Sequence, residues 1–265
     1  MSKKEDINVW FWAEPNNFGD YLGHYIPAKL TGYNVKYIHL NSPVKKYVIV
    51  GSVLNSLLQH TENCTVWGAG IMTRSDVIPS NVQILAVRGK ETQQRMIDCG
   101  LVPPDIIGDP ALLLPKIYSP PKTKKYKLGI IPHFVDYSQI CKEAEGVEGV
   151  RVINLRTTDI EQTIDEIASC EYTISSSLHG IITSHAYNIP CLWYKFSNKI
   201  YGDGIKFLDY FSSVSIPYYE AFRVTKETSS INSIVEIVSS NNNINHINSF
   251  DVDSLYNSCP FLKNS

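Results

Sequence analysis

A repeated alternation of short apolar strands with helices constrains the fold of this chain more than any other feature of its sequence. Runs rich in β-branched and aromatic residues predict strands, and most are followed by a loop with glycine, proline or asparagine and then by apolar residues at helical spacing. Continuously apolar strands are typical of a parallel sheet that helices cover on both faces. The sequence therefore predicts the α/β class. The predicted strands are residues 7–13, 46–50, 64–67, 82–87, 127–131, 150–154, 171–175 and 191–194.

A proline- and lysine-rich stretch, residues 118–125, interrupts the alternation and has the composition of a linker. With 265 residues, 43% of them hydrophobic, the chain is long enough for two compact units. We predict two α/β lobes with parallel sheets facing a cleft. Residues 1–118 form the N-terminal lobe, and residues 125–265 form the C-terminal lobe with a helical tail. Helical spacing extends over residues 225–239, and a last helix within 250–262 is free to pack on either lobe.

Charge and cysteine usage exclude several classes of protein. The formal net charge of −2 gives no basis for a nucleic-acid-binding surface, which needs lysine and arginine in excess. The 6 cysteines are scattered without a C-x-x-C pair, so we expect buried thiols in a reducing compartment. We find no signal peptide and no apolar run of roughly 20 residues, so we expect a cytoplasmic protein, with peripheral contact at the inner membrane face left open.

Missing motifs narrow the chemistry further. The phosphate-binding motif G-x-x-x-x-G-K-[ST], a dinucleotide motif G-x-G-x-x-G after the first strand, and the nucleophile elbow G-x-S-x-G are all absent. His179 and His185 do not share a helix face and have no third ligand placed beside them, so we expect no metal site there. The chemistry that remains is group transfer involving a small or sugar-linked anion.

Residues 171–194 are the most informative stretch, because a predicted strand ends and a helix begins at residues 176–179. Such a junction directs backbone N–H groups and the positive end of a helix dipole at one point, which favours an anion there. His179 places an imidazole beside that anion. A capped turn with an ordinary histidine is the alternative interpretation.

Four further polar residues are candidates for the same site. Arg88 and His133 each follow a predicted strand closely, and ligands gather at the carboxyl ends of parallel strands. Asp20 lies where it either caps the first helix or faces the cleft. Lys206 lies in an apolar segment that predicts a partly buried turn or short helix. A solvated arginine and a capping aspartate are the structural alternatives.

Six segments of the chain, in order, resemble the polysaccharide pyruvyl transferase family. They are N-N-F-G-D-Y-L (16–22), V-R-G-K-E-T (87–92), G-D-P-A-L (108–112), I-P-H-F-V-D (131–136), S-S-S-L-H-G (175–180) and K-F-L-D-Y-F (206–211). The resemblance implies two Rossmann-like lobes similar to those of GT-B glycosyltransferases. It also implies transfer of the pyruvyl unit of phosphoenolpyruvate to two sugar hydroxyls, which gives a cyclic ketal and phosphate.

The resemblance further implies roles on the donor side. Arg88 clamps the carboxylate and phosphate of phosphoenolpyruvate, and the helix start at Ser177 and Leu178 cradles them. His179 protonates the vinyl carbon as general acid. Lys206 neutralises the departing phosphate. Many family members have arginine where this chain has Ser177, so the donor charge must rest on Arg88 and a second cation that the sequence does not identify.

On the acceptor side, the resemblance implies that Asp20 and His133 orient or deprotonate the sugar and that Asn17 contacts it. The expected acceptor is a galactose-like sugar of a lipid-linked oligosaccharide for capsule or exopolysaccharide. No metal or redox cofactor is expected, since phosphoenolpyruvate is a co-substrate. The alternatives are a nucleotide-sugar glycosyltransferase of the same architecture and a non-catalytic carbohydrate-binding subunit, because a fold does not fix a function.

Overall fold

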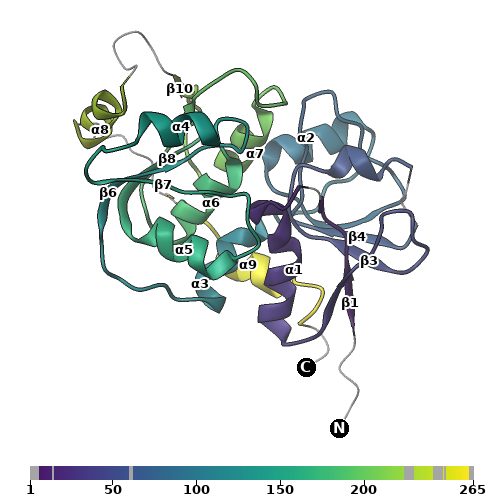
Figure 1. Ribbon diagram of the computed structural model, residues 1–265. Coiled ribbons are helices and arrows are strands. Elements are labelled where there is room, and N and C mark those ends of the chain that lie inside the picture. Colours follow the sequence, from purple (N-terminus) through teal and green to yellow (C-terminus); the bar gives the residue numbers. More distant parts are fainter. Residues whose placement is uncertain are drawn as a thin grey trace.

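The computed structural model describes residues 6–13, 15–59, 62–223, 230–240, 247 and 249–262. These residues form two α/β lobes that lie side by side, each built on one five-stranded sheet (Figure 1). Paired strands run parallel in both sheets. The predicted fold class, α/β with two Rossmann-like lobes, is confirmed.

The N-terminal lobe contains the sheet β2-β1-β3-β4-β5. Every residue of β4 is buried, which explains why this strand is apolar without alternation. Helix α1 begins after Asn17, whose side chain accepts a hydrogen bond from the Gly19 N–H, and ends at Gly32 in the left-handed conformation. The elements are β1 (Ile7–Val9), α1 (Phe18–Thr31), β2 (Val35–Tyr37), β3 (Lys46–Val48), η1 (Leu54–Leu57), β4 (Cys64–Trp67), β5 (Gln83–Ala86), α2 (Lys90–Asp98), η2 (Pro110–Leu113) and α3 (Leu114–Ile117).

The C-terminal lobe contains the sheet β10-β9-β8-β6-β7. The predicted change from strand to helix at residues 176–179 is confirmed, since β8 ends at Ser175 and α6 begins at Leu178. The elements are β6 (Tyr126–Ile131), α4 (Tyr137–Glu143), β7 (Val150–Val152), α5 (Ile160–Ala168), β8 (Cys170–Ser175), α6 (Leu178–Ala186), β9 (Cys191–Lys195), α7 (Ile205–Ser213), β10 (Phe222–Arg223) and α8 (Ile231–Ser240).

The last helix, α9 (Val252–Asn257), returns to the N-terminal lobe. Ser258 accepts a hydrogen bond from the Trp67 indole at 2.9 Å, and the Phe261 ring contacts Tyr47 with ring centroids 4.7 Å apart. Of the two placements that the sequence leaves open for this last helix, the structure shows contact with the N-terminal lobe. The reason is apolar burial, because Leu255 and Phe261 join the core at the N-terminal sheet.

Other elements also differ from the sequence prediction. The short strand β2 was not expected, and the helix predicted after the second strand is a single turn of 3-10 helix, η1. Residues 225–229 of the predicted tail helix lie outside the described residues. Among the described residues, the helices lack the combination of length and apolar character that crossing a bilayer requires.

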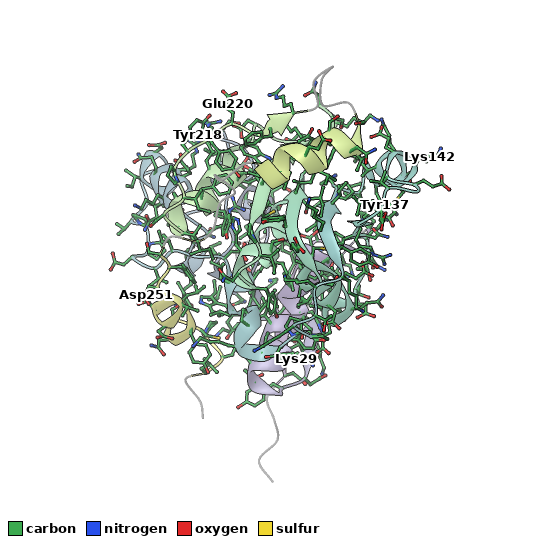
Figure 2. All side chains as sticks on the ribbon, turned by 90° about the vertical axis from the view of Figure 1, so that its left-hand side faces the viewer. Lys29, Tyr137, Lys142, Tyr218, Glu220 and Asp251 are labelled. Carbon is green, nitrogen blue, oxygen red and sulfur yellow. The ribbon has the colours of Figure 1, made fainter. Side chains whose placement is uncertain are left out.

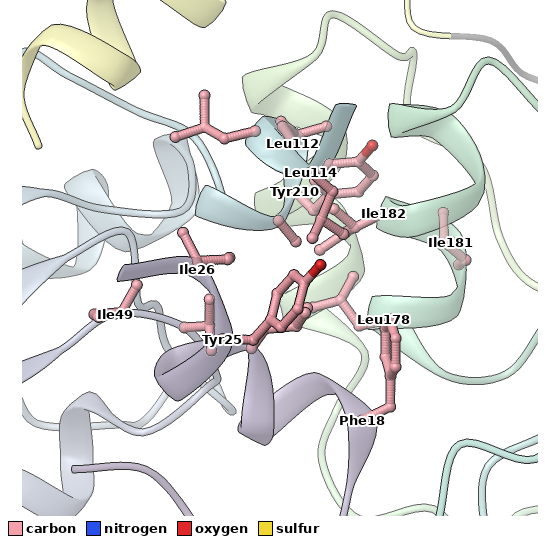
Figure 3. Packing of buried hydrophobic residues seen from close by; sticks show 14 of the residues in the cluster. Phe18, Tyr25, Ile26, Ile49, Leu112, Leu114, Leu178, Ile181, Ile182 and Tyr210 are labelled. Carbon is pink, nitrogen blue, oxygen red and sulfur yellow. The ribbon is translucent and has the colours of Figure 1, made fainter. Parts of the chain in front are cut away.

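The largest apolar cluster continues from one lobe into the other. Helix α1 lies against α5 and α6 of the opposite lobe (Figure 1), and Figure 3 shows side chains of α1, η2, α6 and α7 within this core. The backbone joins the lobes as well, since the Phe18 N–H donates to the Leu155 carbonyl at 2.8 Å. Burying each large apolar side chain is worth about 1.5–3 kcal/mol, so this core holds the lobes in one arrangement.

A fully buried ion pair also joins the lobes. Arg88, between β5 and α2, donates from Nε to Asp209 on α7 at 2.9 Å, and both side chains have 0% exposure. The other guanidinium nitrogens donate to the Ser52 hydroxyl and the Ile71 carbonyl, each at 2.6 Å. Thr92 completes the network by donating its N–H and hydroxyl to Asp209. Every charged group in the network therefore has partners, which a buried ion pair requires.

Removing one partner of this pair should destabilise the protein strongly. Asp209→Asn leaves the Arg88 charge buried without its counter-ion, and we expect a loss of about 3–5 kcal/mol in the free energy of unfolding. Replacing both residues by apolar ones, as in Arg88→Met with Asp209→Leu, should recover much of that loss. Urea unfolding of the purified variants measures both effects.

The exposed ion pair between Lys116 and Asp253 is the control for that experiment. Asp253→Asn should leave the unfolding midpoint unchanged, because solvent screens exposed pairs. If Asp209→Asn is no more destabilising than Asp253→Asn, the buried pair does not hold the lobes together.

Candidate active site

The two sheets share one strand order, 2-1-3-4-5, when each lobe is numbered from its own first strand. In such sheets, ligands bind outside the carboxyl ends of the two strands where the winding direction reverses. These strands are β1 and β3 in the N-terminal lobe, and β6 and β8 in the C-terminal lobe. Most predicted site residues lie in the loops or helix starts that follow these strands, namely Asn17, Asp20, His133, Ser177, Leu178 and His179.

On the N-terminal side, Asn17 and Asp20 form one unit at the start of α1. Asn17 Nδ2 donates to Asp20 Oδ2 at 2.8 Å, while Asn17 Oδ1 caps the helix. The capping role considered for Asp20 therefore belongs to Asn17. Burial raises the pKa of Asp20 to about 7, although the hydrogen bond from Asn17 and the charge of Lys206 oppose this shift.

On the C-terminal side, hydroxyl groups tie the start of α6 to the end of β6. The Ser175 hydroxyl donates to the Ile131 carbonyl at 2.9 Å, and the Ser176 hydroxyl accepts the His133 N–H at 2.8 Å. The Ser177 side chain makes no capping hydrogen bond to α6. The first amide N–H groups of this helix, from Leu178 onward, are therefore available to an anion.

The two sides touch each other instead of facing across an open cleft. A Cβ atom on Gly19 would lie 2.0 Å from Nδ1 and 2.5 Å from Cγ of His179, so only glycine fits at this position of α1. The start of α1 therefore lies directly against the imidazole. Asp20 and His179, from different lobes, are brought to one place.

His179 is almost completely buried and is neutral in the ligand-free protein. Burial, followed by the charges of Arg88 and Lys206, lowers the pKa of His179 to about 3. Its Nε2 atom lies 3.7 Å from Oδ2 of Asp109, and both atoms are buried without a hydrogen-bond partner. Burial raises the pKa of Asp109 to about 6.

Lys206, at the start of α7, supplies the available positive charge of the site. It forms no ion pair among the described residues. Burial and the charge of Arg88 lower the pKa of Lys206 to about 8, while Asp20 opposes the shift. Lys206 in turn lowers the pKa values of both His133 and His179. Lys206 therefore lies close enough to Asp20, His133 and His179 to act on all three electrostatically.

The donor-clamping role of Arg88 stays a prediction. In the structure its guanidinium has 0% exposure, and each of its three nitrogens donates a hydrogen bond. The reason is Asp209, whose carboxylate comes from the other lobe and pairs with it. In this structure the positive charge of Arg88 acts on the site electrostatically, because it lowers the pKa values of His179 and Lys206.

His133 lies at the edge of the pocket, partly buried and in contact with the Phe134 ring. Burial and the charge of Lys206 lower the pKa of His133 to about 4, although Asp136 opposes this. A small pocket next to these residues is lined by Ser176, Trp193 and Lys206 together with the loop of residues 200–204. Ser176, which lies just before α6, and Lys206 therefore line the same small pocket.

Two carboxylates of the site were missed by the sequence analysis, Asp109 and Asp209. Both lie in segments that carried the family resemblance, G-D-P-A-L and K-F-L-D-Y-F, but neither shows a spacing that indicates its partner. Asp209 meets Arg88 across 121 positions of the chain. Only the packing of one lobe on the other reveals these pairings.

The fold and the site define a two-lobed α/β protein with a candidate anion-binding active site at the lobe boundary. The model of the polysaccharide pyruvyl transferase family matches residues 15–198. The chain belongs to this family, and the resemblance inferred from the six segments is confirmed.

Individual relatives support the assignment to different degrees. An uncharacterized protein (L143) of Acanthamoeba polyphaga mimivirus is 30% identical over 228 residues, which cover 80% of this chain and 76% of the viral protein. The succinoglycan biosynthesis protein ExoV of Rhizobium meliloti (strain 1021) is 26% identical, with 81% of this chain and 62% of that protein covered. A solved structure of a functionally uncharacterized Klebsiella pneumoniae protein shares the fold, with a TM-score of 0.51 at 13% identity over 83% of this chain and 93% of that one.

The contact between Gly19 and His179 generates a prediction about α1. Gly19→Ala forces the imidazole out of its position, and we expect a loss of about 1–3 kcal/mol in the free energy of unfolding, as for other overpacked sites. Gly23→Ala is the matched control, because its Cβ would lie no closer than 3.4 Å to any side chain of the core. Urea unfolding should place Gly19→Ala well below the parent and Gly23→Ala near it. Equal midpoints for the two variants would contradict the contact.

The raised pKa of Asp20 predicts a pH-dependent stability. An aspartate in the unfolded chain has a pKa near 4, whereas the pKa of Asp20 in the folded protein is about 7. Between these values the folded protein keeps a proton that the unfolded chain has lost, so Asp20 lowers stability as the pH rises. Asp20→Asn removes this effect. Its stability relative to the parent should increase by about 2 kcal/mol between about pH 5 and pH 8, measured by urea unfolding.

Asp203→Asn is the control for the pH series. Burial raises the pKa of Asp203, but hydrogen bonds from Arg74 and Ile205 outweigh it and leave the pKa below its ordinary value. The stability difference between this variant and the parent should stay constant over the same pH range. A constant difference for Asp20→Asn as well would show that Asp20 is not buried in the pocket.

Proposed function

We propose that this protein is a pyruvyltransferase that moves the pyruvyl unit of phosphoenolpyruvate onto two hydroxyls of a sugar, forming a cyclic ketal. Membership of the polysaccharide pyruvyl transferase family and the similarity to a succinoglycan biosynthesis protein support a role in polysaccharide biosynthesis. The observation that carries the proposal is the proximity of Lys206, which forms no ion pair among the described residues, to the buried His179 at the uncapped start of α6.

The donor, phosphoenolpyruvate, carries a carboxylate and a phosphate, which need fixed positive groups. Lys206 and the first N–H groups of α6, at Leu178 and His179, provide them. Lys206 is thus our candidate for the cation that compensates for Ser177, where many relatives have arginine. Ser177 adds a hydroxyl that α6 does not use for capping. Arg88 contributes the electrostatic effect of its positive charge from within the buried network.

His179 is the proposed general acid, and the donor itself makes this role possible. In the ligand-free pocket, burial, Arg88 and Lys206 keep His179 neutral. The negative charges of phosphoenolpyruvate offset both cations, which raises the pKa of His179 and allows it to hold a proton. Protonation is therefore coupled to donor binding, and positioned acid catalysis of this kind is worth about 10²–10⁴-fold in rate.

The reaction then proceeds without a redox step. His179 protonates the vinyl CH2 of phosphoenolpyruvate to CH3, which leaves an oxocarbenium-like centre at the neighbouring carbon. One sugar hydroxyl adds to this carbon, and the second hydroxyl displaces phosphate from it. Of the two hydroxyl protons, one restores His179 and the other leaves with phosphate. Lys206 stabilises the departing phosphate.

The acceptor is proposed to approach Asp20, Asn17 and His133, which lie at the lobe boundary and orient or deprotonate its hydroxyls. A groove beside the pocket shares Trp193 and Lys195 with it and is also lined by Tyr218 and Glu220. Tyr218 and Glu220 lie at the molecular surface (Figure 2). An exposed aromatic ring beside a carboxylate suits a sugar ring. A galactose-like unit of a lipid-linked oligosaccharide, destined for capsule or exopolysaccharide, remains our proposed acceptor.

Ligand-induced stabilisation distinguishes the proposed pyruvyltransferase from a nucleotide-sugar glycosyltransferase. Phosphoenolpyruvate should raise the Tm of the protein, whereas UDP-glucose and UDP-galactose should not, because only a ligand of the folded state shifts the unfolding equilibrium. Lys206→Gln should weaken phosphoenolpyruvate binding by about 10- to 100-fold, the value of one charge-assisted contact. Stabilisation by the UDP-sugars alone would favour a nucleotide-sugar glycosyltransferase.

A turnover measurement distinguishes the proposed pyruvyltransferase from a non-catalytic sugar-binding subunit. With phosphoenolpyruvate and a panel of sugar acceptors, the parent should release phosphate, and mass spectrometry should detect a product heavier by one pyruvic acid less one water. His179→Gln should abolish this release while remaining folded. His39→Gln, which changes an exposed histidine on the surface of the N-terminal lobe, is the matched control and should keep full turnover.

A further inference from the structure

Asp109 places against His179 one carboxylate oxygen that its structural role does not use. It lies in the turn before η2, where its Oδ1 accepts the Ala111 N–H at 3.0 Å and caps that helix. Its Oδ2 lies 3.7 Å from His179 Nε2. Both atoms are buried, and neither has a hydrogen-bond partner among the residues that the structure describes. Helix capping therefore accounts for one oxygen of this carboxylate but not for the other.

Two unpaired polar atoms side by side are costly to bury. An unsatisfied buried donor or acceptor costs about 1–3 kcal/mol in folding free energy. A hydrogen bond between these two atoms would remove that cost. The distance is only slightly longer than a hydrogen bond, and hydrogen bonds that serve catalysis are often long before the substrate binds and shorten in the complex. The arrangement is that of a carboxylate poised to orient an imidazole.

We propose that Asp109 is a positioning residue for His179. Its carboxylate accepts the Nε2–H of the imidazole, so that Nδ1 is the nitrogen that takes up and delivers the proton in pyruvyl transfer. Nδ1 is also the atom closest to Gly19, where the two lobes meet. The identity of the proton acceptor rests on the proposed function, whereas the pairing of Asp109 with His179 does not.

The charges around the pair agree with this assignment. Arg88 and Lys206 both oppose a positive charge on His179, so an imidazolium needs an anion beside it. Asp109 supplies that anion, because its pKa of about 6 leaves it mostly ionised at neutral pH. Burial and Asp209 raise this pKa, whereas the Ala111 N–H and Arg88 lower it. The carboxylate thus stabilises the protonated form that general acid catalysis requires.

Asp109→Asn tests the assignment because it separates capping from positioning. The amide oxygen can still accept the Ala111 N–H, but the amide then presents NH2 groups, which are donors, to His179. We expect the neutral imidazole to change from the Nε2–H to the Nδ1–H tautomer, as reported by its ring 15N chemical shifts, with His179→Gln used for assignment. The kcat for phosphate release should fall by about 10²–10⁴-fold with little change in KM.

Asp76→Asn is the matched control, since Asp76 is a buried carboxylate whose hydrogen bonds stay within its own turn, to Met72 and Thr73. It should change neither the tautomer nor kcat. An Nδ1–H tautomer in the parent near neutral pH, or parental kcat in Asp109→Asn, would overturn the assignment. If Asp109→Asn does not fold, the tautomer of the parent alone decides. The expected tautomer in a protein that releases no phosphate would retain the pairing and reject pyruvyl transfer.

Discussion

The contact between the backbone of Gly19 and the imidazole of His179 is the constraint on which the rest of the site depends. Each lobe alone has an ordinary ligand-binding edge at the point where its sheet reverses winding direction. Because α1 approaches His179 so closely, the two edges meet, and the charge of Lys206 affects both Asp20 from one lobe and His179 from the other. The shared apolar core and the buried pair of Arg88 with Asp209 hold this contact in place.

Burial at this contact explains the electrostatics of the pocket. Asp20, Asp109, His179 and Lys206 are all shifted towards their neutral forms, and desolvation is the largest cause in each case. Such a pocket costs stability, which the large lobe interface offsets. In the proposed function, the negative charges of the donor offset the two cations, which makes a proton on His179 less costly.

Apolar runs and helical spacing in the sequence predicted individual strands and helices. The buried strands, and the change from strand to helix before His179, follow from apolar runs and spacing, and both are present. The same patterns could not place α9, whose apolar residues fit either lobe, nor show that Arg88 is neutralised by a carboxylate from α7. The role of Asp109 was equally hidden, because its position in a turn already has a capping explanation. In each case the deciding information is how one lobe packs on the other, which local sequence patterns do not show.

A crystal structure of the protein with phosphoenolpyruvate bound decides whether the two edges form one donor site. We expect the phosphate or carboxylate within hydrogen-bond distance of Lys206 Nζ and the first N–H groups of α6, with the vinyl carbon facing His179. Phosphoenolpyruvate bound at any other surface, with Lys206 and His179 making no contact to it, would show that the two edges do not form one donor site.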